Sequence, residues 1–159
     1  MKVLAWIENG AVRFIELQPE WTKDDIRKRF SAAIQGEGAG ITFCRVVERE
    51  DLPADARFRL AWELSNGRVV LSLTKAKKHT RDRILQLWQI VGPKLMAKKR
   101  YAEATGDAAD LAEADAEIAQ WQALRQSGAI GAATNTEELW KVYQTAFDLA
   151  EPYLEENRG

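Results

Sequence analysis

The stretch Arg68–Trp88, "RVVLSLTKAKKHTRDRILQLW", decides the fold, because the spacing of its apolar residues changes within it. Its first part alternates, which places three apolar residues on one face of an expected strand: Val69, Leu71 and Leu73. From Lys75 onward the apolar residues return every three or four positions, which is the period of an amphipathic helix. Thr74 stands between the two patterns and is a natural helix N-cap. We therefore expect a strand that ends at Thr74 and a long helix that begins directly after it.

Two hairpins are expected upstream of this point. Asn9-Gly10 and Asn66-Gly67 each separate two β-prone runs, and Asn-Gly is the dipeptide that best tolerates the positive φ angles of a two-residue turn. The first hairpin would pair strands near 2–8 and 11–17. The second would lie within residues 58–73.

Between the hairpins the sequence predicts one helix and one further strand. Thr22 and Asp25 have the spacing of a helix capping box, and an amphipathic segment follows them. Gly36, Gly38 and Gly40 end this helix, and "ITFCRVVE" is typical of a strand. Nucleotide-binding glycine loops instead connect a strand to a following helix. We therefore expect a turn at these glycines and no nucleotide site.

The rest of the chain predicts helices. Gly92-Pro93 interrupts the apolar seam of the long helix, and an internal proline kinks or breaks a helix. Gly106 is suited to a helix C-cap, and a second helix is expected over 107–126. After a loop of small residues, a capping box at Asn135 begins a last helix, which Pro152 closes.

Together these patterns predict an α+β protein. A small antiparallel β-sheet with one packed helix would occupy residues 1–73, and a helical hairpin followed by a terminal helix would occupy residues 74–159.

The single cysteine, Cys44, excludes an internal disulfide framework and fits a reducing compartment. It lies in an apolar run, where a buried thiol is expected rather than a nucleophile. We expect no secretory signal, because the N-terminus reaches a charged residue and a turn by residue 10. We expect no membrane contact, because no run approaches the roughly 20 apolar residues of a membrane span.

Charge is distributed unevenly in the helical half. Residues 75–100 hold nine basic residues and one acidic residue, whereas residues 101–120 hold six acidic residues and no basic one. If the two segments fold back on each other at Gly106, the late basic residues meet the early acidic ones, as flanking charges do in coiled coils. This pairing explains Lys94–Arg100 and leaves the earlier basic cluster unexplained.

Two interpretations of the earlier basic cluster stay open. It is either the solvated start of a helix or a contact surface for a polyanion such as nucleic acid. The basic side chains point around most of the helix circumference, and the chain has a formal net charge of −1, so the first interpretation is favoured. The residues of the alternative polyanion contact are Lys75, Lys77, Lys78, Arg81 and Arg83.

We expect neither a catalytic site nor a metal site. The chain has one histidine, His79, and one cysteine in a different element, whereas a metal centre needs several such ligands. Asp82 follows His79 at a spacing that allows a local pair on one helix face. No serine belongs to a recognisable triad motif. The sequence therefore predicts a protein that is not an enzyme and holds no cofactor.

Large apolar side chains at the C-terminal end predict a binding surface. Six tryptophans fall about one per expected element, and most of them are expected in the core. The last helix and the segment after it carry more aromatic bulk than one seam can bury, which predicts contact with another protein or with a second copy of this chain. The expected partner-binding residues are Trp140, Tyr143, Phe147, Tyr153 and Leu154.

Several short motifs follow one another between Asp51 and the middle of the last expected helix. They are "LPADARFRLAWE" at Leu52–Glu63, a short strand at Val69–Leu73, "KAKKHTRDR" at Lys75–Arg83, the turn Gly106-Asp107, "QALR" at Gln122–Arg125 and "TEEL" at Thr136–Leu139. Taken in this order, the motifs resemble those of a family of bacteriophage and prophage tail-region proteins that is similar to tail assembly chaperones.

The resemblance implies a non-enzymatic protein that binds phage tail or tail-fibre proteins. Such a protein is either a virion tail component or a factor for tail or tail-fibre assembly. In this family Lys75–Arg83 would be a feature of a helix start and not an active site. We therefore expect the protein in the virion or in the cytoplasm of the bacterial host, with nucleic-acid binding as the alternative function.

Overall fold

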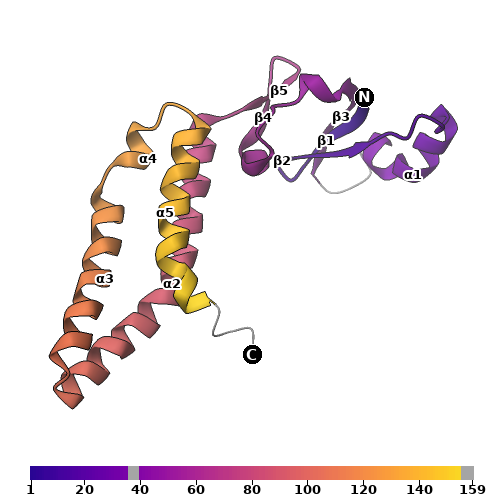
Figure 1. Ribbon diagram of the computed structural model, residues 1–159. Helices are drawn as coiled ribbons and strands as arrows, with labels where there is room; N and C mark the ends of the chain where they lie inside the picture. The colour runs from indigo at the N-terminus through magenta and orange to yellow at the C-terminus, as the bar shows by residue number, and fades with distance from the viewer. Residues whose placement is uncertain (36–39, 155–159) are drawn as a thin grey trace. The chain divides into compact units, whose positions relative to one another are not determined.

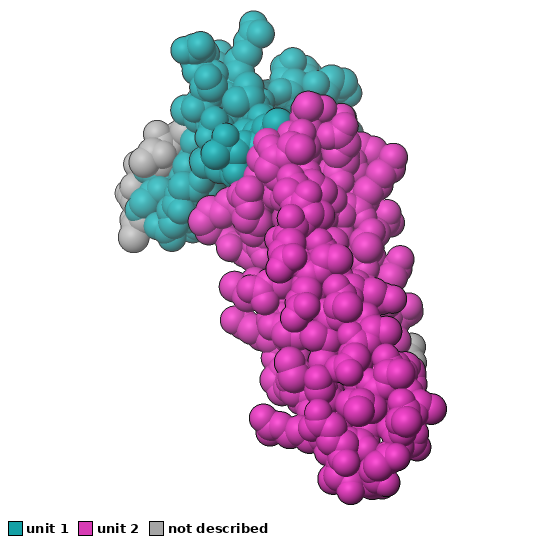
Figure 2. All heavy atoms as spheres, turned by 90° about the vertical axis from the view of Figure 1, so that its left-hand side faces the viewer, with its two compact units in different colours: residues 1–76 teal, residues 77–159 magenta. Residues whose placement is uncertain are grey.

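The computed structural model describes residues 1–35 and 40–154 and has the expected α+β fold (Figure 1). Its chain divides into two compact units, residues 1–76 and residues 77–159 (Figure 2). The helices and strands, in chain order, are β1 (Lys2–Glu8), β2 (Ala11–Glu16), α1 (Lys23–Gln35), β3 (Ile41–Glu48), β4 (Trp62–Ser65), β5 (Arg68–Leu71), α2 (Leu73–Thr105), α3 (Ala108–Gln126), α4 (Ala129–Ala132) and α5 (Thr136–Leu154).

The first unit contains two antiparallel sheets, one with strand order β2-β1-β3 and one formed by β4 and β5. Both predicted Asn-Gly turns are confirmed: φ is 50° at Asn9 and 78° at Gly10, and 50° at Asn66 and 74° at Gly67. The capping box of α1 is also confirmed, since the Asp25 carboxylate accepts from the Thr22 amide at 2.9 Å. Gly36 and Gly38 lie outside the described residues. The core of this unit consists of Val3, Ile7, Val12, Leu52, Trp62 and Val69.

The second hairpin is shorter than predicted. Residues Ala56–Ala61 form a 3-10 helix, whose start Asp55 caps by accepting from the Arg57 amide at 3.1 Å. The strand β5 ends at Leu71, and Ser72 caps α2 in place of Thr74, because the Ser72 hydroxyl accepts from the Lys75 amide at 3.3 Å. Serine and threonine are both favoured at helix N-caps, so residue type alone did not exclude either position.

Of the two predicted effects of Gly92-Pro93 on the long helix, a kink or a break, the break does not occur. The helix α2 continues through Pro93 to Thr105 and changes direction along its length (Figure 1). A proline restricts the preceding residue partly through that residue's Cβ, and Gly92 has none, which lets the helix pass. Gly106, at φ 69°, ends α2 as predicted, and Asp107 then caps α3 by accepting from the Ala109 and Asp110 amides.

The C-terminal segments hold two further differences from the expected pattern. The expected small-residue loop contains the single-turn helix α4, and α5 extends through Pro152 to Leu154. Asn135 caps α5 as predicted, accepting from the Glu138 amide at 3.0 Å. The buried core that joins α2, α3 and α5 consists of Ile84, Leu87, Val91, Leu95, Ala114, Trp121, Ala146 and Ala150.

Candidate functional site

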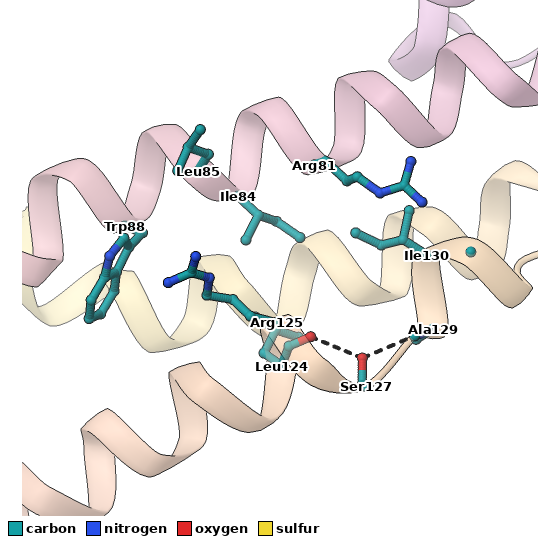
Figure 3. Close-up of a pocket in the computed structure, with 11 residues that line it drawn as sticks. Arg81, Ile84, Leu85, Trp88, Leu124, Arg125, Ser127, Ala129 and Ile130 are labelled. Atoms are coloured by element: carbon teal, nitrogen blue, oxygen red, sulfur yellow. Dashed lines mark hydrogen bonds between the residues drawn. The ribbon is translucent and has the colours of Figure 1, made fainter.

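A groove of about 460 Å³ lies on the second unit between α2, α3 and α4 (Figure 3). We call it the Arg81–Arg125 groove after the two charged residues on its walls. α2 contributes one wall, the end of α3 a second, and the turn into α4 closes it. The residues that line it are Arg81, Ile84, Leu85, Trp88, Leu124, Arg125, Ser127, Gly128, Ala129, Ile130 and Gly131.

The turn that closes the groove is fixed by local hydrogen bonds. Gly128 has a φ of 67°, in the left-handed region that favours glycine, and reverses the chain after α3. The Ser127 hydroxyl donates to the Leu124 carbonyl at 2.9 Å and accepts from the Ala129 amide at 3.3 Å. On the other side, the Lys77 ammonium group donates to the Gly131 carbonyl at 2.6 Å and so ties α4 to α2.

The floor of the groove is part of the core of this unit. Ile84 is buried, and Trp88 packs against Trp121 with ring centroids 5.5 Å apart. Leu124 and Ile130 are partly buried against the same core. A floor made of core residues is held in place by packing, so the groove is a preformed apolar surface.

The walls carry positive charge that nothing in the described chain neutralises. Figure 3 shows the Arg81 side chain reaching from α2 toward Ile130, and the Arg125 side chain reaching from α3 toward Trp88. Among the described residues, neither guanidinium group has a hydrogen-bond acceptor or an ion-pair partner, and no acidic residue lines the groove. The nearest acid in sequence, Asp82, accepts from Lys78 at 2.7 Å, which lowers the pKa of its carboxyl group.

The other members of the predicted polyanion contact are engaged within the chain. Each forms a contact that either neutralises its charge or orients its side chain. These contacts are Lys75 with the Glu63 carboxylate at 3.1 Å, Lys77 with the Gly131 carbonyl at 2.6 Å, Lys78 with the Asp82 carboxylate at 2.7 Å, and the Arg83 guanidinium over the Tyr143 ring at 5.7 Å.

The predicted aromatic binding surface on α5 is divided between core and surface. Trp140, Tyr143 and Phe147 form a ladder with ring centroids 5.4 Å and 6.3 Å apart. Trp140 is half-buried, and Tyr143 packs against the core, as do Tyr153 and Leu154. Phe147 alone of the five is exposed.

Tyr153 has an internal partner that the sequence did not reveal. Its hydroxyl donates to the Glu117 carboxylate on α3, which also accepts from Lys98 on α2 at 2.9 Å. Burial raises the pKa of Tyr153 to about 12, and the bond to Glu117 adds to the effect. The hydrogen bond to Glu117 likewise raises the pKa of Lys98.

The predicted meeting of late basic and early acidic residues is confirmed. Lys98 contacts Glu113 at 3.1 Å as well as Glu117, and Lys99 contacts Asp115 at 2.7 Å. These pairs join α2 to α3 on both sides of the turn at Gly106. The aromatic and ionic contacts around Glu117 therefore hold the three long helices together.

The histidine and the cysteine are placed apart. His79 lies half-buried on α2, and Cys44 lies half-buried in β3, where burial raises the pKa of its thiol. Over the described ranges, no three His, Cys, Asp or Glu side chains gather as a metal ion would need. In the same part of the chain, no helix has the length and apolar character to cross a membrane.

Comparisons with known proteins give no relative for this chain: no family model, no curated protein and no solved structure matches it.

The groove itself was not predicted from the sequence. Its two arginines are 44 positions apart, and only the antiparallel course of α2 and α3 brings them to one surface. The available signal was that Arg125 follows an apolar seam at a helix end, with no acidic residue nearby to pair with it.

Proposed function

We propose that this chain is a non-enzymatic, protein-binding component of a bacteriophage tail region, acting in the virion or as a factor for tail or tail-fibre assembly. The observation that supports this function is the Arg81–Arg125 groove. Its apolar floor and unpaired guanidinium groups suit a protein segment that carries an apolar side chain beside a carboxylate. Guanidinium groups bind carboxylates through two parallel hydrogen bonds, which makes them selective for such segments.

The groove also joins two motifs of the family resemblance. Arg81 belongs to "KAKKHTRDR", and Arg125 is the last residue of "QALR". The two motifs are far apart in sequence, and in the structure they supply opposite walls of one groove. A shared binding role gives a physical reason for both motifs to occur in one chain.

The first test is mass spectrometry of purified phage particles from a strain that carries this gene. Peptides of this chain at stoichiometric amounts would identify a tail component. A protein that is abundant in the lysate, missing from the particles and recovered with a tail protein would identify an assembly factor. A protein that is missing from the particles and binds no tail protein would contradict the proposal.

The second test asks whether the groove is the binding surface. We expect the double change Arg81→Glu and Arg125→Glu to abolish recovery of the tail protein, since it reverses both charges at an apolar floor. Lys141→Glu reverses an exposed charge on α5 and is the matched control. Unchanged recovery by the double variant, with the fold verified by circular dichroism, would place the binding surface elsewhere.

The alternative function, nucleic-acid binding through Lys75–Arg83, receives less support from these contacts. Charges that are already paired within the chain release fewer counterions when they meet phosphate. A filter-binding assay with DNA and RNA at low salt separates the two functions. Affinity that falls steeply with added salt would support the alternative, and no binding at low salt would remove it.

A further inference from the structure

The middle of α2 exposes a face that carries no charge. Between Ile84 and Ala97 the only charged residue is Lys94, and its ammonium group donates to the Tyr153 carbonyl of α5 at 2.6 Å. The exposed fractions of Leu85, Ile90 and Met96 are 48%, 41% and 39%. We call these residues, all of them exposed, the uncharged α2 face: Leu85, Gln86, Gln89, Ile90, Pro93, Met96 and Ala97.

The exposed face of α5, in the same unit, differs in composition from the uncharged α2 face. The exposed residues of α5 are, apart from Phe147 and Pro152, polar or charged: Glu137, Glu138, Lys141, Gln144, Thr145, Asp148 and Glu151. The uncharged α2 face extends over about 18 Å of helix, at 1.5 Å per residue. An exposed surface of this length without one charge is typical of a protein contact.

The charges on either side of the uncharged α2 face have opposite signs. Asp82 precedes the face and Arg100 follows it, each nine positions from residue 91. Eighteen residues make about five whole helical turns, so both side chains lie on one side of α2. The Asp82 side chain is 47% exposed and accepts from Lys78 through one oxygen, Oδ2, at 2.7 Å, whereas its second oxygen has no hydrogen bond among the described residues. The Arg100 guanidinium likewise has no acceptor among them.

We propose that the uncharged α2 face binds the same face of a second copy of this chain, with the two α2 helices antiparallel about a two-fold axis near residue 91. In this arrangement Asp82 meets Arg100 of the second copy, and the symmetry forms that pair twice. A parallel arrangement would place Asp82 against Asp82 and Arg100 against Arg100. Charge complementarity thus selects a second copy as the occupant and fixes its orientation.

The size of the face sets the expected strength of the dimer. A standard interface takes about 20–30 residues from each partner, and this face has seven. We therefore expect reversible dimerisation that depends on concentration in the micromolar range. The contact is independent of the proposed tail function, since it uses neither Arg81 nor Arg125, although Leu85 borders both surfaces.

The experiment is sedimentation velocity of the full chain over a concentration series. The wild-type chain should shift from monomer to dimer, and Ile90→Glu with Met96→Glu should stay monomeric at every concentration, because the symmetry brings four carboxylates together in the contact. Thr145→Glu, on the exposed side of α5, is the control and should dimerise as the wild type does. A wild-type chain that stays monomeric throughout would overturn the proposal.

Charge reversal tests the orientation. Asp82→Arg or Arg100→Asp alone should raise the dissociation constant by about tenfold, since each places two like-charged pairs at the contact. The double reversal should restore the wild-type constant, and so should an equimolar mixture of the two single variants. Asp148→Arg on α5 controls for net charge. Single and double variants that dimerise equally weakly would overturn the antiparallel arrangement.

Discussion

Glu117 joins three helices through one carboxylate, because it lies on α3 and accepts from Tyr153 of α5 and from Lys98 of α2. We expect Glu117→Gln to lower the free energy of unfolding by about 1–2 kcal/mol, since the amide keeps one acceptor and loses the charge. Urea unfolding followed by circular dichroism measures this. Glu113→Gln is the control: its side chain is 63% exposed, and it should change stability by less than about 0.5 kcal/mol. Equal effects of the two changes would contradict this role of Glu117.

The raised pKa of Tyr153 predicts how stability changes in alkali. The folded pKa is about 12, whereas an unfolded tyrosine titrates near about 10. The stabilisation is therefore complete below pH 10 and is lost as the pH rises through 12. We expect a loss on the order of 1 kcal/mol over this interval, because Tyr153 is partly exposed. Tyr153→Phe should remove the latest phase of the tyrosinate absorbance titration, and a late phase that persists in this variant would contradict the assignment.

The sequence predicted the ionic contacts of α2 and α3 but not the role of Tyr153. Lys99 and Asp115 belong to charge runs on either side of a clear turn, so their meeting followed from the hairpin. Tyr153 was predicted to lie on a binding surface, because a pattern of apolar residues counts its ring and not its hydroxyl group. The hydroxyl of this partly buried tyrosine also takes a partner, and that partner lies 36 positions away on another helix.

The packing of α2 depends on the absence of a side chain at Gly92. A Cβ built at Gly92 would lie 3.0 Å from the Trp88 ring, which cannot easily move because it packs against Trp121. We expect Gly92→Ala to lower the free energy of unfolding by about 1–3 kcal/mol, which exceeds the gain of up to about 1 kcal/mol in helix propensity. Chemical denaturation measures the change.

A double-mutant cycle separates the two effects at Gly92. In a Trp88→Ala background the clash is absent, so Gly92→Ala should stabilise the chain by its helix propensity. If Gly92→Ala destabilises both backgrounds equally, contact with Trp88 is not the cause.

At the scale of elements, the sequence was most accurate where local chemistry alone determines the conformation. The Asn-Gly turns and the caps at Thr22 and Asn135 need only their neighbours in the chain. Sequence left a kink and a break open at Gly92-Pro93, and no break occurs because the packing of both halves of α2 against one core outweighs the missing hydrogen bond. Ala56–Ala61 likewise alternates as a strand does, yet forms a 3-10 helix that buries Phe58 and Ala61.

At the scale of the molecule, the two cores do not share residues. One is built from residues between Val3 and Val69, and the other from residues between Ile84 and Ala150. The boundary between the compact units follows Ala76, three residues after the boundary expected from the change of apolar period. That boundary falls inside α2, whose backbone hydrogen bonds join residues four positions apart and therefore continue across it.

Separate cores predict that the helical unit folds without the sheets. We expect a fragment of residues 72–159 to retain its helical circular dichroism and to unfold cooperatively, since it keeps the Ser72 cap, the core around Trp121 and the bond from Lys77 to Gly131. A fragment of residues 84–159 loses the Ser72 cap and the bond from Lys77 to Gly131. Its melting temperature should be about 4–8 °C lower for each kcal/mol that these two contacts contribute to stability. Calorimetry of both fragments and of the full chain measures this. A fragment 72–159 without a cooperative transition would show that the helical core depends on the first unit.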